Sequence, residues 1–65
     1  MSGATIRVML VDDSALDIAI LRGIIDPMEG VEIVATASSG KEALELIPKH
    51  LPDVVCTDYM MPAMD

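Results

Sequence analysis

Short apolar runs alternate along this chain with stretches in which apolar and polar residues are mixed. Three runs rich in β-branched residues are typical of strands and cover residues 6–11, 31–35 and 54–57. The first and third are apolar at nearly every position, which is typical of strands buried on both faces. Glu32 interrupts the second run and favours a more exposed position at a sheet edge.

A first helix is predicted between the first two runs. Ser14 is a good N-cap residue, and Asp17 follows it at the spacing of a capping box. Apolar residues then recur with helical spacing as far as Ile25. The helix is expected to stop at Asp26-Pro27, because a residue that precedes proline avoids the helical region.

A second helix is predicted over residues 41–47. Ser39 and Glu42 form another capping pair at its start. Pro48 has no amide hydrogen to donate, so it should kink or end this helix.

The resulting order is β-α-β-α-β, which predicts an α/β fold with a parallel sheet and right-handed crossovers. With 65 residues the chain holds one domain, residues 1–65, and no second domain. A chain of this size buries only about 60% of its unfolded surface, so an isolated monomer should be marginally stable.

Composition excludes several classes of function. The net charge is −7, from 4 Lys and Arg against 11 Asp and Glu, which argues against direct nucleic-acid binding. One Cys and one His can form neither an internal disulfide nor a zinc cage. No run is long enough to span a membrane and no signal peptide is visible, so a cytoplasmic location is expected.

Acidic residues follow two of the predicted strands. Asp12 and Asp13 come directly after the first, and Asp58 comes directly after the third. Ligands collect at the carboxyl ends of parallel strands, so the three carboxylates would meet there if these strands are neighbours. Such a cluster would hold Mg²⁺ and could accept a phosphoryl group on a carboxylate. Separately, each acid has a simpler interpretation, as a first-turn helix residue or a turn aspartate.

The motifs together resemble the receiver domain of two-component response regulators. They are VDDS at 11–14, ASSGKEAL at 37–44, PDVV at 52–55 and DYMMPAMD at 58–65. The stretch DDSAL at 12–16 is most similar to chemotaxis-type receivers, including those fused to a methylesterase domain. The resemblance implies a flavodoxin-like fold in which these three strands lie in the order 2-1-3.

The resemblance also implies the site and its partners. Asp58 would be the phospho-accepting residue, and Asp12 and Asp13 would hold Mg²⁺ together with Asp58 and the backbone carbonyl of Met60. The partner would be a sensor histidine kinase or a phosphotransfer protein.

The chain departs from the family after the third strand, and residues 1–65 are therefore interpreted as a partial receiver domain. The family's Thr or Ser after a fourth strand and its Lys after a fifth have no counterpart, and neither Lys41 nor Lys49 matches that lysine. We expect phosphorylation of this chain to be impaired.

Two other functions are open. The chain could be an interaction fragment that forms a homodimer through the third strand, or that pairs there with a missing C-terminal half. It could instead be a carboxylate-dependent phosphatase, but Asp58-Tyr59-Met60 lacks the second aspartate of the D-x-D-x-[TV] motif, so we predict no enzymatic activity.

The remaining residue types receive simpler predictions. Cys56 is expected to be a buried small hydrophobe in the third strand, and Met9 a core residue. His50 is expected at the end of the second helix or on the surface. For Met60, Met61 and Met64, core and exposed positions are equally compatible with the sequence.

Overall fold

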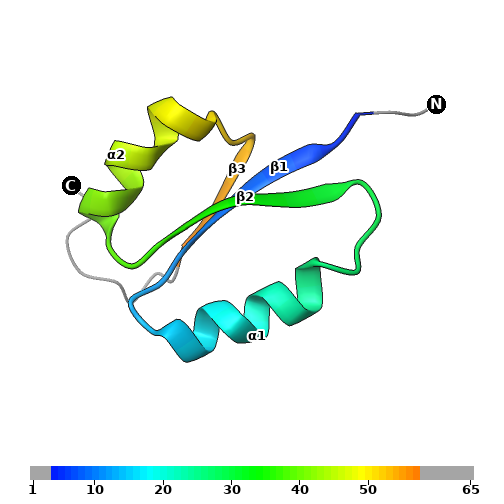
Figure 1. Ribbon diagram of the computed structural model, residues 1–65, viewed down its shortest axis with the longest axis horizontal. Helices are drawn as coiled ribbons and strands as arrows, with labels where there is room; N and C mark the ends of the chain where they lie inside the picture. The colour runs from blue at the N-terminus through cyan, green and yellow to red at the C-terminus, as the bar shows by residue number, and fades with distance from the viewer. Residues whose placement is uncertain (1–3, 58–65) are drawn as a thin grey trace.

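Three strands and two helices make up the part of the chain that the computed structural model describes, residues 4–57. In chain order they are β1 (Ile6–Val11), α1 (Ala15–Ile25), β2 (Val31–Ala37), α2 (Gly40–His50) and β3 (Val54–Thr57). The alternation predicted from the sequence is therefore confirmed (Figure 1).

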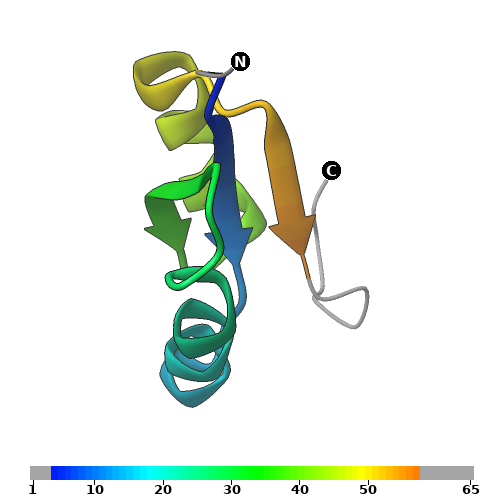
Figure 2. The same ribbon diagram turned by 90° about the vertical axis from the view of Figure 1, so that its right-hand side faces the viewer.

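The strands form one parallel sheet in the order β2-β1-β3, as the resemblance implied. β1 is central and pairs with β2 from Ile6 opposite Val31 to Val11 opposite Ala37. The register of this pair shifts between Val8 and Met9. Figure 2 shows β1 between its two neighbours and β3 as an outer strand.

The two helices lie on opposite sides of the sheet (Figure 1), and both contact β2. The core on the α2 side contains Met9, Val11, Ala37 and Ala43, all at most 2% exposed. Because side chains alternate between the faces of a strand, Val8 and Leu10 are buried towards the other face. The central part of β1 is thus buried on both faces, and Met9 is a core residue as predicted.

Both helices begin where the capping signals placed them. The Ser14 hydroxyl accepts the Asp17 amide at 3.2 Å, and the Ser39 hydroxyl accepts the Glu42 amide at 3.1 Å. Each bond satisfies an amide that has no partner within its helix. Neither α1 nor α2, the helices of the described part, is long and apolar enough to cross a membrane.

The prediction for the end of the second helix was wrong. α2 continues through Pro48 to His50 and ends at Leu51, which has a left-handed backbone with a φ of 48°. The Leu51 amide donates to the Ile47 carbonyl at 2.7 Å and closes the last turn. The missing Pro48 amide therefore costs the helix one bond without ending it. β2 is also longer than predicted and ends at Ala37.

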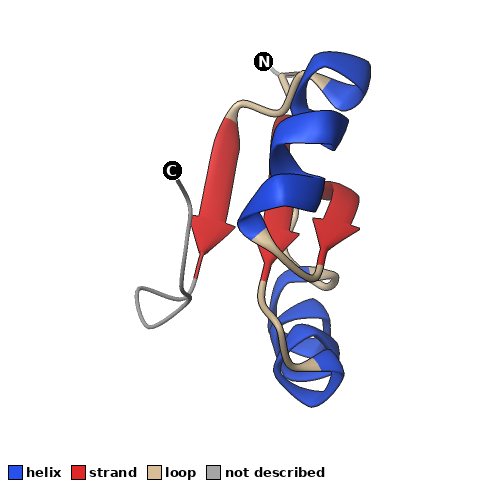
Figure 3. Cartoon of the chain, turned by 90° about the vertical axis from the view of Figure 1, so that its left-hand side faces the viewer, coloured by secondary structure: helices blue, strands red, loops and turns tan. Residues whose placement is uncertain are grey.

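The prediction that β3 is buried on both faces, with Cys56 in a core, was also wrong. All four residues of β3 are exposed, including Val54 at 45% and Val55 at 37%, and Cys56 is exposed as well. β3 pairs with β1, whereas the principal helix contacts are with β2. Figure 3 shows β3 standing clear of both helices. Within residues 4–57, β3 therefore contacts chiefly β1, and its apolar side chains stay exposed.

Candidate functional site

The carboxyl ends of β1 and β3 lie side by side. The last residue of β1, Val11, pairs with the last residue of β3, Thr57, in parallel register. Asp12 and Asp13 follow β1 directly. The neighbouring strands on which the predicted acidic site depends are therefore present. Asp58 and Met60, the other two predicted ligands, lie outside the described residues.

Asp12 is a buried carboxylate, with only 5% of its surface exposed. Its amide donates to the Ala37 carbonyl of β2 at 3.0 Å, which extends the sheet contact by one residue. Its Oδ1 atom accepts the Ser14 amide at 2.9 Å. These two bonds hold the carboxylate at the junction between β1 and the start of α1.

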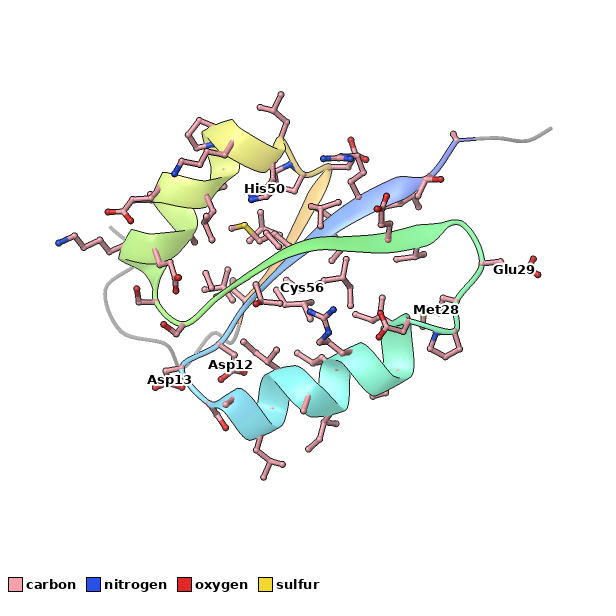
Figure 4. All side chains as sticks on the ribbon, in the orientation of Figure 1. Asp12, Asp13, Met28, Glu29, His50 and Cys56 are labelled. Atoms are coloured by element: carbon pink, nitrogen blue, oxygen red, sulfur yellow. The ribbon has the colours of Figure 1, made fainter. Side chains whose placement is uncertain are left out.

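Asp13 differs from its neighbour because it is exposed. Figure 4 shows both residues at the turn from β1 into α1. The pair thus combines one fixed carboxylate with one that is open to solvent. Both lie close to the N-terminal end of α1, where the helix dipole favours negative charge.

A hollow of about 210 Å³ adjoins Asp12. It is lined by Asp12 and three residues of α1, namely Asp17, Ile20 and Leu21. Ile20 and Leu21 belong to the apolar residues that recur with helical spacing in the sequence, a pattern that predicted the helix but no site. Ile20 is 52% exposed, so the helix presents part of its apolar surface beside the acidic residues.

The donor set fits a hard divalent cation. Mg²⁺ prefers oxygen ligands, keeps several waters and is usually held by one or two carboxylates. Asp12 and Asp13 supply carboxylate oxygens from one turn, and a buried carboxylate is more stable when a cation neutralises it. No group of three His, Cys, Asp or Glu within residues 4–57 is arranged to hold a metal. A three-carboxylate site therefore needs a residue outside that range.

The first turn of α2 contains a further acidic residue, Glu42, whose carboxylate is engaged in a local hydrogen-bond network. The Glu42 carboxylate accepts both the amide of Ser38, at 2.7 Å, and its hydroxyl, at 3.0 Å. The amide bond first, and then the hydroxyl bond, lowers the pKa of Glu42 from its usual value, and desolvation opposes this weakly. Glu42 thus stabilises the start of α2.

Comparison with known sequences identifies the family. The family model described as "Response regulator receiver domain" matches residues 8–65. A protein-glutamate methylesterase/protein-glutamine glutaminase of Oleidesulfovibrio alaskensis is 48% identical over 92% of this chain. A protein of the same name from Myxococcus xanthus is 43% identical over 92% of this chain. The chain spans only 16% and 17% of the lengths of these two proteins.

Solved structures agree with the sequence comparison. The response regulator domain of Thermotoga maritima CheB has a TM-score of 0.84 and 39% identity, over 94% of this chain and 46% of that one. The receiver domain of the putative response regulator NarL from Mycobacterium tuberculosis has a TM-score of 0.86 and 40% identity, over 97% of this chain and 51% of that one. The paired aspartates after β1, the 2-1-3 parallel sheet and these matches lead to one conclusion: the chain belongs to the response regulator receiver domain family.

Proposed function

We propose that this chain is the phospho-accepting part of a receiver, with Asp58 as the phosphorylated residue. Mg²⁺ would be held by Asp12, Asp13 and Asp58, with the backbone carbonyl of Met60 as a further ligand. The observation that carries the proposal is the pairing of Val11 with Thr57. It makes Asp12 and Asp58 the next residues along two adjacent parallel strands.

The chemistry assigned to each residue follows from its surroundings. A bound Mg²⁺ ion would neutralise charge on the three carboxylates and on a phosphoryl donor. The bond from the Ser14 amide holds Asp12 in one orientation, so this carboxylate needs little reorganisation to act as a ligand. In the transfer itself, an Asp58 carboxylate oxygen forms a bond to phosphorus while the donor's bond to phosphorus breaks and its leaving group departs.

Kinase and relay partners follow from the same proposal. A sensor histidine kinase or a phosphotransfer protein would supply the phosphoryl group, and the cytoplasm would be the compartment. The methylesterase relatives favour a chemotaxis-type regulatory role in which this chain itself catalyses no reaction. Because residues 1–65 contain no counterpart of the family's later Thr/Ser and Lys, we expect slow phosphorylation of this chain alone.

A magnesium titration tests the proposed site. Mg²⁺ added to isotope-labelled chain should shift the NMR resonances of Asp13 and Asp58, and those of Glu29 should stay in place. The double variant Asp13→Ala with Asp58→Ala should abolish the shifts of the other residues around the turn after β1. Shifts that persist in the double variant would place the metal elsewhere and contradict the proposal.

Self-association is a second candidate function, favoured by the exposure of β3. Val54 and Val55 are 45% and 37% exposed on an outer strand that carries no charge or proline to block pairing. A second copy could pair antiparallel with β3 across a two-fold axis, giving a continuous sheet of six strands, three from each copy.

Sedimentation equilibrium distinguishes the two candidates. Two results together would support self-association through β3. The chain would be a dimer that Val54→Lys converts to a monomer, and adding Mg²⁺ with a phosphate mimic would leave its mass unchanged. A monomer at micromolar concentration would exclude it. The rest of a receiver domain would compete with a second copy for the exposed edge of β3, because the chain covers only 46% and 51% of the two solved domains.

A further inference from the structure

Arg7 and Asp53 form a reciprocal pair at the end of the sheet opposite to the acidic site. The Arg7 amide donates to Oδ2 of Asp53 at 2.9 Å, and the Asp53 amide donates to the Arg7 carbonyl at 2.7 Å. The Arg7 guanidinium also donates, through Nη2, to the His50 carbonyl at 2.5 Å. One residue of β1 thus holds both the last residue of α2 and the residue that precedes β3. We call the Arg7–Asp53 pair the clamp.

The clamp lies directly before the first paired residues of the two strands. Asp53 is followed by Val54, and Val54 pairs with Val8, the residue after Arg7. From there the register continues without a break to Val11 opposite Thr57. The position of the last residue of β3 is therefore linked to the pairing at its start.

Burial does little to fix this register. A one-residue slip normally moves buried side chains to the solvent face, and this penalty specifies the register of most strands. All four β3 side chains are exposed in residues 4–57, so the penalty is small here. A slip would still move the strand by about 3.3 Å and reverse the side-chain directions. Ligand distances in metal sites vary by only about 0.2 Å, so a slip of this size would be incompatible with a site shared between the ends of β1 and β3.

We propose that Arg7 and Asp53 are positioning residues that set the register of β3 on β1, and thereby fix Thr57 as the residue at which β3 ends beside Val11. The functional part of this inference rests on the proposed role of Asp58, but the register does not. Asp53 provides the essential side-chain oxygen. Arg7 contributes through its backbone, and its guanidinium adds the link to α2.

Two substitutions at one position separate the hydrogen bond from the charge. Asp53→Asn removes the charge but keeps an oxygen that can accept the Arg7 amide, whereas Asp53→Ala removes the acceptor. Glu29→Ala is the control for charge, since Glu29 is an exposed residue between α1 and β2. Gly30→Ala is the control for stability, because it strains the turn before β2 and leaves both partners of the clamp unchanged. The Gly30 carbonyl accepts the Ile6 amide on the β2 side of β1, whereas the clamp lies on the β3 side.

The first measurement is the register itself, from NMR cross-strand contacts between Met9 and Val55 in the 65-residue chain. The second is the Mg²⁺ affinity of the folded fraction, from the titration described above. We expect Asp53→Ala to shift or lose the Met9–Val55 contacts and to weaken Mg²⁺ binding at least tenfold. We expect Asp53→Asn and both controls to keep the contacts and to bind Mg²⁺ within about twofold of the unchanged chain.

The outcomes separate this inference from the proposed function. Intact register in Asp53→Ala would overturn the clamp, whatever the metal does. Lost register with unchanged Mg²⁺ affinity would overturn the positioning role. If the unchanged chain binds no Mg²⁺, the proposed site fails, and the positioning role fails with it. A register that depends on the Asp53 oxygen would still support the structural half of the inference.

Discussion

The Ser14 amide donates to Oδ1 of Asp12 at 2.9 Å, so the residue that caps α1 also orients the buried carboxylate that directly follows β1. Ser14 uses its hydroxyl for the helix and its amide for Asp12. The start of α1 and the geometry of the candidate site are therefore coupled. A substitution at Asp12 can change the fold, the metal affinity or both, depending on which oxygen it keeps.

Asp12→Asn should separate these two effects. The amide oxygen of asparagine can still accept the Ser14 amide, so the free energy of unfolding should change by less than about 1 kcal/mol. The lost charge should weaken Mg²⁺ binding about tenfold or more. Asp12→Ala should lose the binding too, and also about 1–2 kcal/mol of stability, because the Ser14 amide loses its partner. Denaturant unfolding and Mg²⁺ titration of both variants check this. Equal Mg²⁺ affinity in Asp12→Asn and the unchanged chain would remove Asp12 from the site.

The lowered pKa of Glu42 predicts that the fold loses part of its stability in acid. Because hydrogen bonds from Ser38 lower the pKa of Glu42 in the folded chain, the carboxylate stabilises the fold fully above the ordinary glutamate pKa. This contribution is lost as the pH falls through the folded-state pKa. Glu42→Gln should therefore flatten the loss of stability that occurs as the pH falls below the ordinary glutamate pKa.

The matched control for this prediction is Glu45→Gln, since Glu45 is exposed on the same helix. Denaturant unfolding over the acid range, with an NMR titration of the Glu42 side chain, provides the measurement. If both variants keep the same acid slope as the unchanged chain, the Ser38 bonds do not contribute to stability as described.

Two exposed glycines should respond to alanine with opposite signs. Gly23 lies within α1, and an added Cβ would meet nothing within 4 Å, so Gly23→Ala should stabilise the chain by about 0.5–1 kcal/mol. An added Cβ at Gly30 would also meet nothing, but φ there is 79°. Gly30→Ala should therefore destabilise the chain by about 1–2 kcal/mol through backbone strain alone. Each variant is the control for the other in thermal or denaturant unfolding, and two changes of the same sign would contradict the assigned conformations.

The strand and helix pattern could be predicted because it depends on local signals. The apolar run in β1, the caps at Ser14 and Ser39 and the stop before Pro27 each act within a few residues. Pro48 shows the limit of such rules. The Leu51 amide closes a turn beyond it, and Leu46 and Ile47 pack against the core on the α2 side of the sheet, so tertiary contacts outweigh one lost bond.

The rest depends on contacts that the sequence pattern does not reveal. The apolar composition of β3 predicted burial of Cys56, but burial requires a neighbour that residues 4–57 do not supply. Arg7 and Asp53 are 46 positions apart and bind mainly through backbone groups, so no pattern in the sequence predicts that they pair. The paired acids of the site, in contrast, were visible because Asp12 and Asp13 directly follow a recognisable strand.

Phosphorylation of Asp58 is the central claim, and intact-mass spectrometry after treatment with phosphoramidate and Mg²⁺ tests it most directly. We predict slow addition of a single phosphoryl group, located on Asp58 by fragmentation, which is lost in Asp58→Asn and strongly reduced in Asp12→Asn or without Mg²⁺. Glu29→Ala should be phosphorylated like the unchanged chain. Modification that persists in Asp58→Asn, or that proceeds equally well without Mg²⁺, would contradict the account.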